Sequence, residues 1–288
     1  LKRMKAQLID GKRISAEIKA EAAEEAAALK AKGITPCLAV VLVGDDSASQ
    51  VYVNNKKKAC EAVGIRSVSH VLSGGTTEEA LLELIAKLNA DQDIHGILVQ
   101  MPVPKQIDER KVILAIDPKK DVDCFHPVNV GNLHTGGEGF LPCTPAGIIE
   151  LIKRSGHSIE GKQCVVIGRS NIVGKPVAML LMQENGTVTI CHSRTRNLAE
   201  ICRGADIIVS AVGKVNTVTA DMVKEGAILI DVGMNRNEAG KLCGDVDFEN
   251  VKEIAGAITP VPGGVGPMTI AMLMKNCNTA AKIQNGLE

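Results

Sequence analysis

The sequence is almost without aromatic residues: its 288 residues include no tryptophan, one tyrosine and three phenylalanines. A surface that stacks nucleic-acid bases needs several exposed rings, so this composition disfavours such a function. An excess of charge of one sign is also absent, because 33 lysines and arginines balance 33 aspartates and glutamates. No bulk electrostatic field therefore attracts nucleic acid or an anionic membrane, and neither is expected as a partner.

The sequence also lacks the cysteine pairs and the long apolar runs that mark other classes of protein. Its nine cysteines form no C-x-x-C pair and lie mostly inside apolar runs. This pattern indicates reduced thiols in a cytoplasmic protein, not disulfides or metal ligands. No apolar run reaches the ~18 residues of a membrane span. The first residues are too few to show a targeting peptide, although processing could have removed one.

The stretch Cys164–Pro176 has the order strand, glycine-bounded turn and helix. An apolar run ends at Gly168, and Gly174 opens a helical segment with proline in its first turn, where the missing N–H costs nothing. The N-terminus of such a helix presents N–H groups that can bind a phosphate. The middle glycine of G-x-G-x-x-G is missing, so an ordinary strand-to-helix turn is the alternative.

Strand-like apolar runs alternate with helical patterns along most of the chain. The expected strands are at 37–43, 66–72, 95–100, 164–167, 187–191, 206–212 and 227–232. The expected helices are at about 14–31, 48–63, 77–89, 108–115, 144–155, 174–182, 197–203, 219–226 and 267–283. Such alternation predicts parallel α/β layers, and the order in the second half is that of a dinucleotide-binding domain.

Residues 117–143 interrupt this alternation, because they are rich in proline and glycine and have little periodicity. They are the predicted domain boundary. We expect an α/β protein of two domains with a cleft between them. Residues 1–142 would form an N-terminal parallel-sheet catalytic domain, onto which 269–288 pack back, and 143–268 a C-terminal Rossmann-type domain.

The second strand of the Rossmann-type domain indicates which nucleotide it binds. In such domains an acidic residue near the end of that strand holds the ribose hydroxyls of NAD. Here Cys191 is followed by H-S-R-T-R without a carboxylate, while Arg169 and Ser170 lie in the first loop. Guanidinium and hydroxyl groups accept a 2′-phosphate that a carboxylate would repel. The sequence therefore favours NADP, with ordinary solvated arginines as the alternative.

Polar residues gather where strands of the first half end. At about 100° per residue, a helix over 48–63 places Ser49, Tyr52 and Lys56 on one face. A run of three lysines is usually a solvated face, but Lys56 shares its face with the only tyrosine, beside a strand end where α/β sheets bind ligands. Gln100 leaves the end of another strand. Asp123 follows in the boundary segment, where acidic residues are most often only solvated.

Seven ordered blocks of sequence resemble a known family over nearly the whole chain. They are YVNNKKKAC (52–60), GILVQMPVP (96–104), KDVDCFHP (120–127), PCTPAG (142–147), GRSNIVGKP (168–176), DVGMNR (231–236) and PVPGGVGPMT (260–269). On these blocks the chain resembles the bifunctional methylenetetrahydrofolate dehydrogenase/methenyltetrahydrofolate cyclohydrolase family.

The resemblance implies an NADP-dependent enzyme of one-carbon metabolism that needs no metal and forms a homodimer. Such an enzyme oxidises 5,10-methylene-tetrahydrofolate and hydrolyses the methenyl product to 10-formyl-tetrahydrofolate. The implied catalytic residues are Lys56, Gln100, Tyr52 and Asp123, with Tyr52 stacked on the folate and Asp123 holding the pterin. The implied substrate contacts are Ser49, Tyr52, Gln100, Pro102, Asp123, Pro262 and Gly263, and the implied cofactor contacts are Gly168, Arg169, Ser170, Ser193 and Met234.

One position departs from the family's pattern, because Cys124 replaces its usual glycine and so puts the backbone geometry beside Asp123 in question.

Three other functions remain open on the sequence. The chain could be a dehydrogenase without cyclohydrolase activity, a different two-domain NADP dehydrogenase, or a non-catalytic NADP-binding sensor or scaffold. The joint presence of Tyr52, Lys56, Gln100 and Asp123 disfavours all three.

Overall fold

The computed structural model describes residues 6–287, except for the side chain of Ala48. The chain divides into two compact units. One, the six-stranded unit, comprises the residues up to Ala16 together with Cys143–Thr269; the other, the three-stranded unit, comprises Glu17–Pro142 and the residues from Ile270 onward. Both are α/β units built on parallel sheets, which confirms the predicted fold class.

The sheet of the three-stranded unit has β2 (Cys37–Val43) between β3 (Arg66–Leu72) and β4 (Gly96–Val99), all parallel. Every residue of β2 is buried, so its run of apolar side chains fills space on both faces of the sheet. This burial explains why the strand reads as a continuous apolar run instead of an alternating one.

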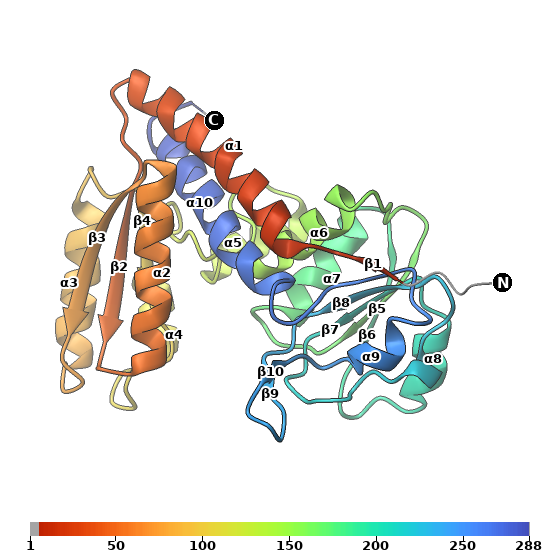
Figure 1. Ribbon diagram of the computed structural model, residues 1–288. Coiled ribbons are helices and arrows are strands. Elements are labelled where there is room, and N and C mark those ends of the chain that lie inside the picture. Colours follow the sequence, from red (N-terminus) through yellow and green to blue (C-terminus); the bar gives the residue numbers. More distant parts are fainter. Residues whose placement is uncertain (1–5, 288) are drawn as a thin grey trace. The chain divides into compact units, whose positions relative to one another are not determined.

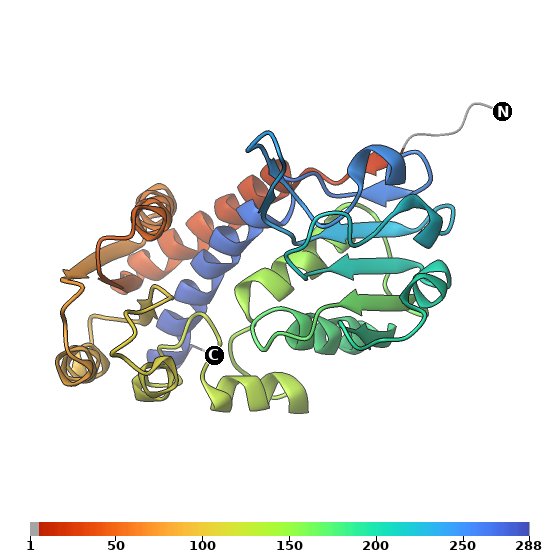
Figure 2. The same ribbon diagram turned by 90° about the horizontal axis from the view of Figure 1, so that it is seen from below.

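Helices cover both faces of this sheet. α2 (Ser47–Val63) lies on one side, while α3 (Glu78–Ala90) and α4 (Glu109–Ala115) lie on the other, as Figure 2 shows. Alternate residues of β2 pack in one core with α3 and α4. A strand-helix-strand order with parallel strands places the loops that carry function at the carboxyl ends of the strands.

The segment predicted to be irregular contains a helix, α5 (Pro127–Thr135). His126 caps it, because its Nδ1 accepts from the backbone N–H of Val128 at 3.2 Å, and Pro127 occupies the first turn. The prediction of an irregular segment was therefore wrong over these nine residues. A short helix begun by proline has too few turns to show an apolar period.

Two long helices, α1 (Gly11–Ala31) and α10 (Val265–Gln284), contribute residues to both units. Within the three-stranded unit they lie side by side, and Asn278 Nδ2 donates to the carbonyl of Ala22 at 2.8 Å (Figure 1). Asn276 Nδ2 donates to the carbonyls of Val122 and Leu141, both at 2.8 Å. α10 is thus tied to the backbone directly before Asp123.

The sheet of the six-stranded unit is entirely parallel. Its order is β1 (Gln7–Leu8), β11 (Ala257–Ile258), β8 (Ile228–Asp231), β7 (Ile207–Ser210), β5 (Gln163–Ile167) and β6 (Thr187–Cys191). The chain runs from β5 outward to β6 and then returns to the other side of β5 as β7. This reversal of direction is the feature beside which open α/β sheets bind nucleotides.

Short helices cover the two faces of this sheet (Figure 1). α6 (Cys143–Arg154) and α7 (Gly174–Gln183) pack against each other, and α7 packs on β5 and β6. The opposite core includes residues of α8 (Leu198–Arg203), the 3-10 turn η1 (Ala220–Met222) and α9 (Phe248–Val251). A hairpin of β9 (Asn235–Arg236) and β10 (Leu242–Cys243) completes the unit.

Two further expectations differ from the structure. The predicted N-terminal domain was to begin at residue 1, but the described residues 6–16 group with the six-stranded unit because β1 pairs with β11, and Gln7 N donates to Gly256 O at 2.8 Å. The helix expected over 219–226 is only the single turn η1. Within residues 6–287, no helix is both long enough and apolar enough to cross a membrane.

Candidate active site

Lys56 and Gln100 meet at the carboxyl ends of two neighbouring strands. α2, which carries Lys56, follows β2, and Gln100 follows β4 directly. Lys56 Nζ donates to Gln100 Oε1 at 2.9 Å. Gln100 Nε2 donates to the carbonyl of Met101 at 3.0 Å, so the amide group is oriented with its oxygen toward the lysine. The structure thus brings together an ammonium group and a fixed carboxamide.

Tyr52 and Ser49 precede Lys56 on the same helix but differ in exposure. Tyr52 lies about one turn before Lys56, and 46% of its surface is exposed, so its ring is free to contact a flat ligand. Ser49 is only 6% exposed. Its backbone N–H donates to the capping carboxylate of Asp46 at 2.8 Å, which fixes the start of α2. Of the three side chains, Ser49 is the least accessible to a substrate.

Asp123 lies in a segment that runs beside β4, where Ile97 N donates to the carbonyl of Lys120 at 2.8 Å. Burial raises the pKa of Asp123, the positive charge of Lys56 lowers it and the nearby Asp121 raises it, and together they give a value of about 6. A carboxylate of this kind is ionised at neutral pH and loses its charge in mildly acidic solution. Lys56 therefore interacts with two of the predicted site residues, with Gln100 through a hydrogen bond and with Asp123 through its charge.

Asp121 holds the turn that carries Asp123, a role that the sequence did not reveal. Its buried carboxylate accepts from the N–H groups of Phe125 at 3.2 Å and His126 at 2.8 Å, and from Asn129 Nδ2 at 2.8 Å. A solvated loop carboxylate and a buried one look alike in a sequence. The only available signal was the position of Asp121 beside apolar Val122 in a segment between two helices.

Lys120 anchors the same segment from its other end. Its side chain is buried, and Nζ donates to the carbonyls of Leu88, Asn89 and Asp91 at distances between 2.7 and 3.0 Å. These carbonyls lie at the C-terminal end of α3, where a cation is favourable. The backbone around Asp123 is therefore fixed by two buried charged side chains.

Cys124 adopts the left-handed conformation that favours glycine, the residue that the family usually has at this position. Its φ is +61°, and its buried Sγ donates to the carbonyl of Phe140 at 3.1 Å. A residue with a Cβ pays about 1–2 kcal/mol for this conformation. The turn thus keeps the geometry that glycine permits, and burial raises the pKa of the thiol to about 12.

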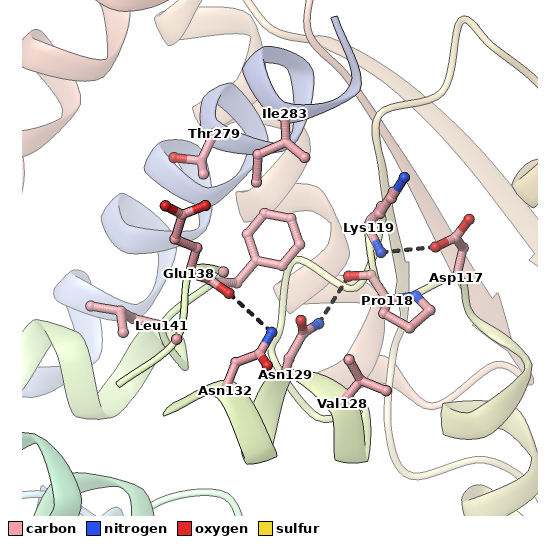
Figure 3. Close-up of a pocket in the computed structure, with 13 residues that line it drawn as sticks. Asp117, Pro118, Lys119, Val128, Asn129, Asn132, Glu138, Leu141, Thr279 and Ile283 are labelled. Carbon is pink, nitrogen blue, oxygen red and sulfur yellow. Dashed lines mark hydrogen bonds between the residues drawn. The ribbon is translucent and has the colours of Figure 1, made fainter. Parts of the chain in front are cut away.

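A cavity of about 910 Å³ lies behind this turn in the three-stranded unit (Figure 3). Its walls come from 117–119, α5, 137–141 and the last turns of α10. None of the residues predicted for the site lines it. Asn129 does line it, while donating to Pro118 O at 2.9 Å and to Asp121. Two of the residues that line the cavity, Asn129 and Phe140, therefore also contact the turn that carries Asp123.

The glycine-bounded turn of the six-stranded unit can be formed only by glycine. Gly168 has φ +126°, and a Cβ there would lie 2.4 Å from the carbonyl oxygen of Ala211. A Cβ on Gly174 would lie 2.3 Å from the carbonyl oxygen of Gly168. Ser170 Oγ accepts from the N–H groups of Val173 at 3.1 Å and Gly174 at 3.2 Å. The serine, which precedes α7, therefore occupies two N–H groups at the start of this helix, where a phosphate had been expected to bind.

Exposed polar side chains surround this turn. The register of β5 and β6 pairs Ile167 with Cys191, so the loops that follow them start side by side. Arg169, Ser170 and Ser193 are exposed in these loops. This set of a guanidinium and hydroxyls fits an anionic phosphate group. The residues present are therefore suited to a phosphorylated dinucleotide.

The remaining predicted contacts lie at the carboxyl ends of β8 and β11. Met234 is 55% exposed and follows β8. Gly263 has φ +102° and follows Pro262, whose peptide bond with Val261 is cis. The bond between Met101 and Pro102, the predicted substrate contact in the three-stranded unit, is also cis. These residues come from the ends of parallel strands, where ligands bind in α/β folds.

Comparison with known families gives two matches that together span almost the whole chain. Residues 9–123 match the catalytic domain of tetrahydrofolate dehydrogenase/cyclohydrolase, and residues 142–285 match its NAD(P)-binding domain. The bifunctional protein FolD of Acetivibrio thermocellus is 61% identical over 281 residues, covering 98% of this chain and 99% of that protein.

Solved structures agree with these matches. The bifunctional FolD dehydrogenase/cyclohydrolase of Campylobacter jejuni is 53% identical with a TM-score of 0.94, covering 96% of this chain and 99% of that one. The Trypanosoma brucei enzyme, solved with NADP and an inhibitor, is 42% identical with a TM-score of 0.91, covering 97% and 98%. The similarity therefore extends over both units.

Proposed function

Because this chain belongs to the tetrahydrofolate dehydrogenase/cyclohydrolase family, we propose that it catalyses two successive steps on one folate. The first oxidises 5,10-methylene-tetrahydrofolate with NADP⁺. The second hydrolyses the methenyl product to 10-formyl-tetrahydrofolate. The observation that carries this proposal is the hydrogen bond of 2.9 Å between Lys56 Nζ and Gln100 Oε1, together with the half-buried carboxyl of Asp123, whose pKa is raised.

Asp123 and Tyr52 bind the folate in this proposal. The pterin presents paired N–H donors along one edge, and an ionised carboxylate accepts two such donors. Tyr52, with its exposed ring, stacks on the flat part of the substrate. Pro102 is the further proposed contact in the three-stranded unit, and Pro262 and Gly263 are those of the six-stranded unit. The hydroxyl of Ser49 is too buried to be a principal contact.

The oxidation needs alignment more than it needs an acid or a base. The carbon that loses hydride is flanked by two nitrogens, which stabilise the cation that forms. NADP⁺, when bound, supplies the hydride acceptor. The task of the protein is to hold the folate through Asp123 and Tyr52 so that this carbon reaches the nicotinamide. No side chain has to move a proton in this step.

The hydrolysis does require proton transfer. Water adds to the methenyl carbon and forms a C–O bond; the bond from that carbon to N5 then breaks, leaving the formyl group on N10. One proton of the water ends on N5 and the other is released. Lys56 and Gln100, held together at 2.9 Å, are positioned to bind this water and to transfer its protons.

Arg169, Ser170 and Ser193 are proposed to select NADP by binding its 2′-phosphate, with Gly168 allowing close approach of the backbone and Met234 bordering the pocket. The carboxylate-free end of β6 and the exposure of these side chains support this choice. Titration with both dinucleotides tests it. NADP⁺ should bind more tightly than NAD⁺, and the reverse order would refute the assignment.

A homodimer in the cytoplasm is proposed from family resemblance. Eight of the nine cysteines are buried, in keeping with thiols that stay reduced. Sedimentation of the purified protein tests the oligomeric state, and a monomer at micromolar concentration would refute the dimer.

One assay separates the proposal from its alternatives. The protein is incubated with 5,10-methylene-tetrahydrofolate and NADP⁺ while NADPH and methenyl-tetrahydrofolate are followed by absorbance. A bifunctional enzyme forms NADPH and hydrolyses added methenyl-tetrahydrofolate. NADPH formation without hydrolysis would indicate a dehydrogenase alone, and neither reaction would indicate a binding protein or another substrate.

A further inference from the structure

Asp245 is a completely buried carboxylate in the six-stranded unit, and it accepts five hydrogen bonds. Few carboxylates bind so many donors, and all five donors here are uncharged N–H or O–H groups. Oδ2 accepts from Ser210 Oγ at 3.1 Å, Val212 N at 2.8 Å and Gly213 N at 3.2 Å, while Oδ1 accepts from Lys214 N at 2.9 Å and Asn235 Nδ2 at 2.9 Å.

Three of these donors belong to one loop, 212–214, which leaves the carboxyl end of β7. β7 and β5 are the neighbours between which the chain reverses its direction across the sheet. The loop begins against the glycine turn, since a Cβ on Gly168 would lie 2.4 Å from Ala211 O. It therefore forms the wall opposite Gly168 at the point where such folds bind a dinucleotide.

The fifth donor connects Asp245 to a second cofactor segment. Asn235 directly follows Met234, the residue expected to border the cofactor. Gly233, on the other side of Met234, packs so closely that a Cβ there would lie 2.3 Å from Asp245 Oδ1. Asp231 fixes this arrangement, because it accepts from Gly233 N and from Asp245 N, both at 2.9 Å.

We propose that Asp245 is a positioning residue for the cofactor: from beneath the pocket, it sets the loop 212–214 and the Met234 segment in the geometry that binds NADP. This inference rests on the proposed dehydrogenase function. It assigns Asp245 no contact with the cofactor and no part in the cyclohydrolase step, because all of its partners lie in the six-stranded unit.

Asp245→Asn is the informative variant because it keeps the shape of the side chain and replaces one acceptor oxygen by a donor. Whichever position the new NH₂ group takes, it faces at least two existing donors. Either the loop 212–214 or the Asn235 side must then move. We expect the KM for NADP⁺ to rise about tenfold or more, because a buried donor left without its acceptor is costly.

The same variant should hydrolyse methenyl-tetrahydrofolate, assayed without dinucleotide, within about twofold of the wild-type rate. This contrast is the readout that a purely structural role would not give. The matched control is Asp206→Asn. Asp206 accepts from Gln163 N at 2.8 Å and from Lys224 Nζ at 2.6 Å, at the opposite end of β7. Its KM for NADP⁺ should stay at the wild-type value.

An unchanged KM for NADP⁺ in Asp245→Asn would overturn the inference, as would an equal loss of both activities. If Asp245→Asn does not fold, Asn235→Ala removes the bonds from Nδ2 to Asp245 Oδ1 and to the carbonyl of Gly244 but keeps the bonds of the loop 212–214. It should raise the KM about threefold or more. An unchanged KM in that variant would also overturn the inference. Failure of the proposed function is distinct, because the wild-type protein would then oxidise no methylene-tetrahydrofolate with NADP⁺.

Discussion

Replacing Lys56 by methionine removes the ammonium group while it keeps a long unbranched side chain on α2. In the structure this ammonium donates to Gln100 Oε1 at 2.9 Å. Its positive charge also opposes the burial that raises the pKa of Asp123 to about 6. The substitution should therefore have two separable effects, one on the hydrolysis of the methenyl group and one on the ionisation of Asp123.

The loss of hydrolysis should be large. A positioned acid or base contributes about 10²–10⁴ in rate, which corresponds to about 2.7–5.4 kcal/mol of activation free energy. We expect a decrease of this size in kcat for methenyl-tetrahydrofolate hydrolysis by Lys56→Met. Oxidation of methylene-tetrahydrofolate needs alignment only, so it should stay within about tenfold of wild type.

The second effect concerns pH. Without the charge of Lys56, the pKa of Asp123 should be higher, because a nearby positive charge favours the ionised carboxylate. In the dehydrogenase assay, the pH below which the KM for methylene-tetrahydrofolate rises should therefore be higher in Lys56→Met than in the wild type. Both activities are measured by absorbance between pH 5 and 8.

Lys57→Met is the matched control, since Lys57 is the next residue on α2, is exposed and points to another face. It should keep both activities. Undiminished hydrolysis by Lys56→Met would refute the role of Lys56. An equal loss of both activities, with a lower melting temperature, would refute the separation of the two steps.

Three further outcomes follow from the same structure. In the wild type, the KM for methylene-tetrahydrofolate should rise as pH falls through about 6, because the raised pKa of Asp123 means that its charge is lost there; a flat profile from pH 5 to 8 would contradict its role. Cys124→Gly should be more stable to urea than Cys124→Ala by about 1–2 kcal/mol, because both lack Sγ and only alanine keeps a Cβ at φ +61°; equal stability would refute the strain. Gly168→Ala should lose at least about 2 kcal/mol of stability or most NADP⁺ binding, because its Cβ would meet Ala211 O at 2.4 Å. The control Gly161→Ala has open space around its Cβ at φ +72° and should lose only about 1 kcal/mol. Equal losses of stability in the two variants would contradict the contact with Ala211.

Patterns that depend on neighbouring residues predicted much of the fold. The predicted strands at 37–43 and 66–72 coincide with β2 and β3. β2 is buried throughout and has no polar interruption, whereas β3 is partly exposed and carries Arg66, two serines and His70. α5 was missed because its nine residues contain proline, asparagine and glycine and show little apolar period. The pairing of β1 with β11 was also missed, since two residues of strand 250 positions from their partner leave no periodic signal.

The site shows the same limit. The turn geometry of helix 48–63 was enough to group Tyr52 with Lys56, but exposure separates them from Ser49, and exposure depends on distant packing. Asp121 and Asp245 look like surface residues in the sequence. Only the fold shows that each is buried and holds several backbone N–H groups, because those donors come from other segments of the chain.

The two units provide different kinds of chemistry, and the reactions explain why. Hydride transfer involves no proton, so the six-stranded unit can work through backbone geometry: glycines that admit no Cβ, and a loop whose N–H groups are held by the buried carboxylate of Asp245. Hydrolysis must move protons at one carbon, so the three-stranded unit exposes titratable groups, Lys56 and Asp123, and fixes them from behind through Asp121 and Lys120. Substitutions in the first set should therefore alter KM for the cofactor, whereas substitutions at Lys56 should alter kcat for hydrolysis.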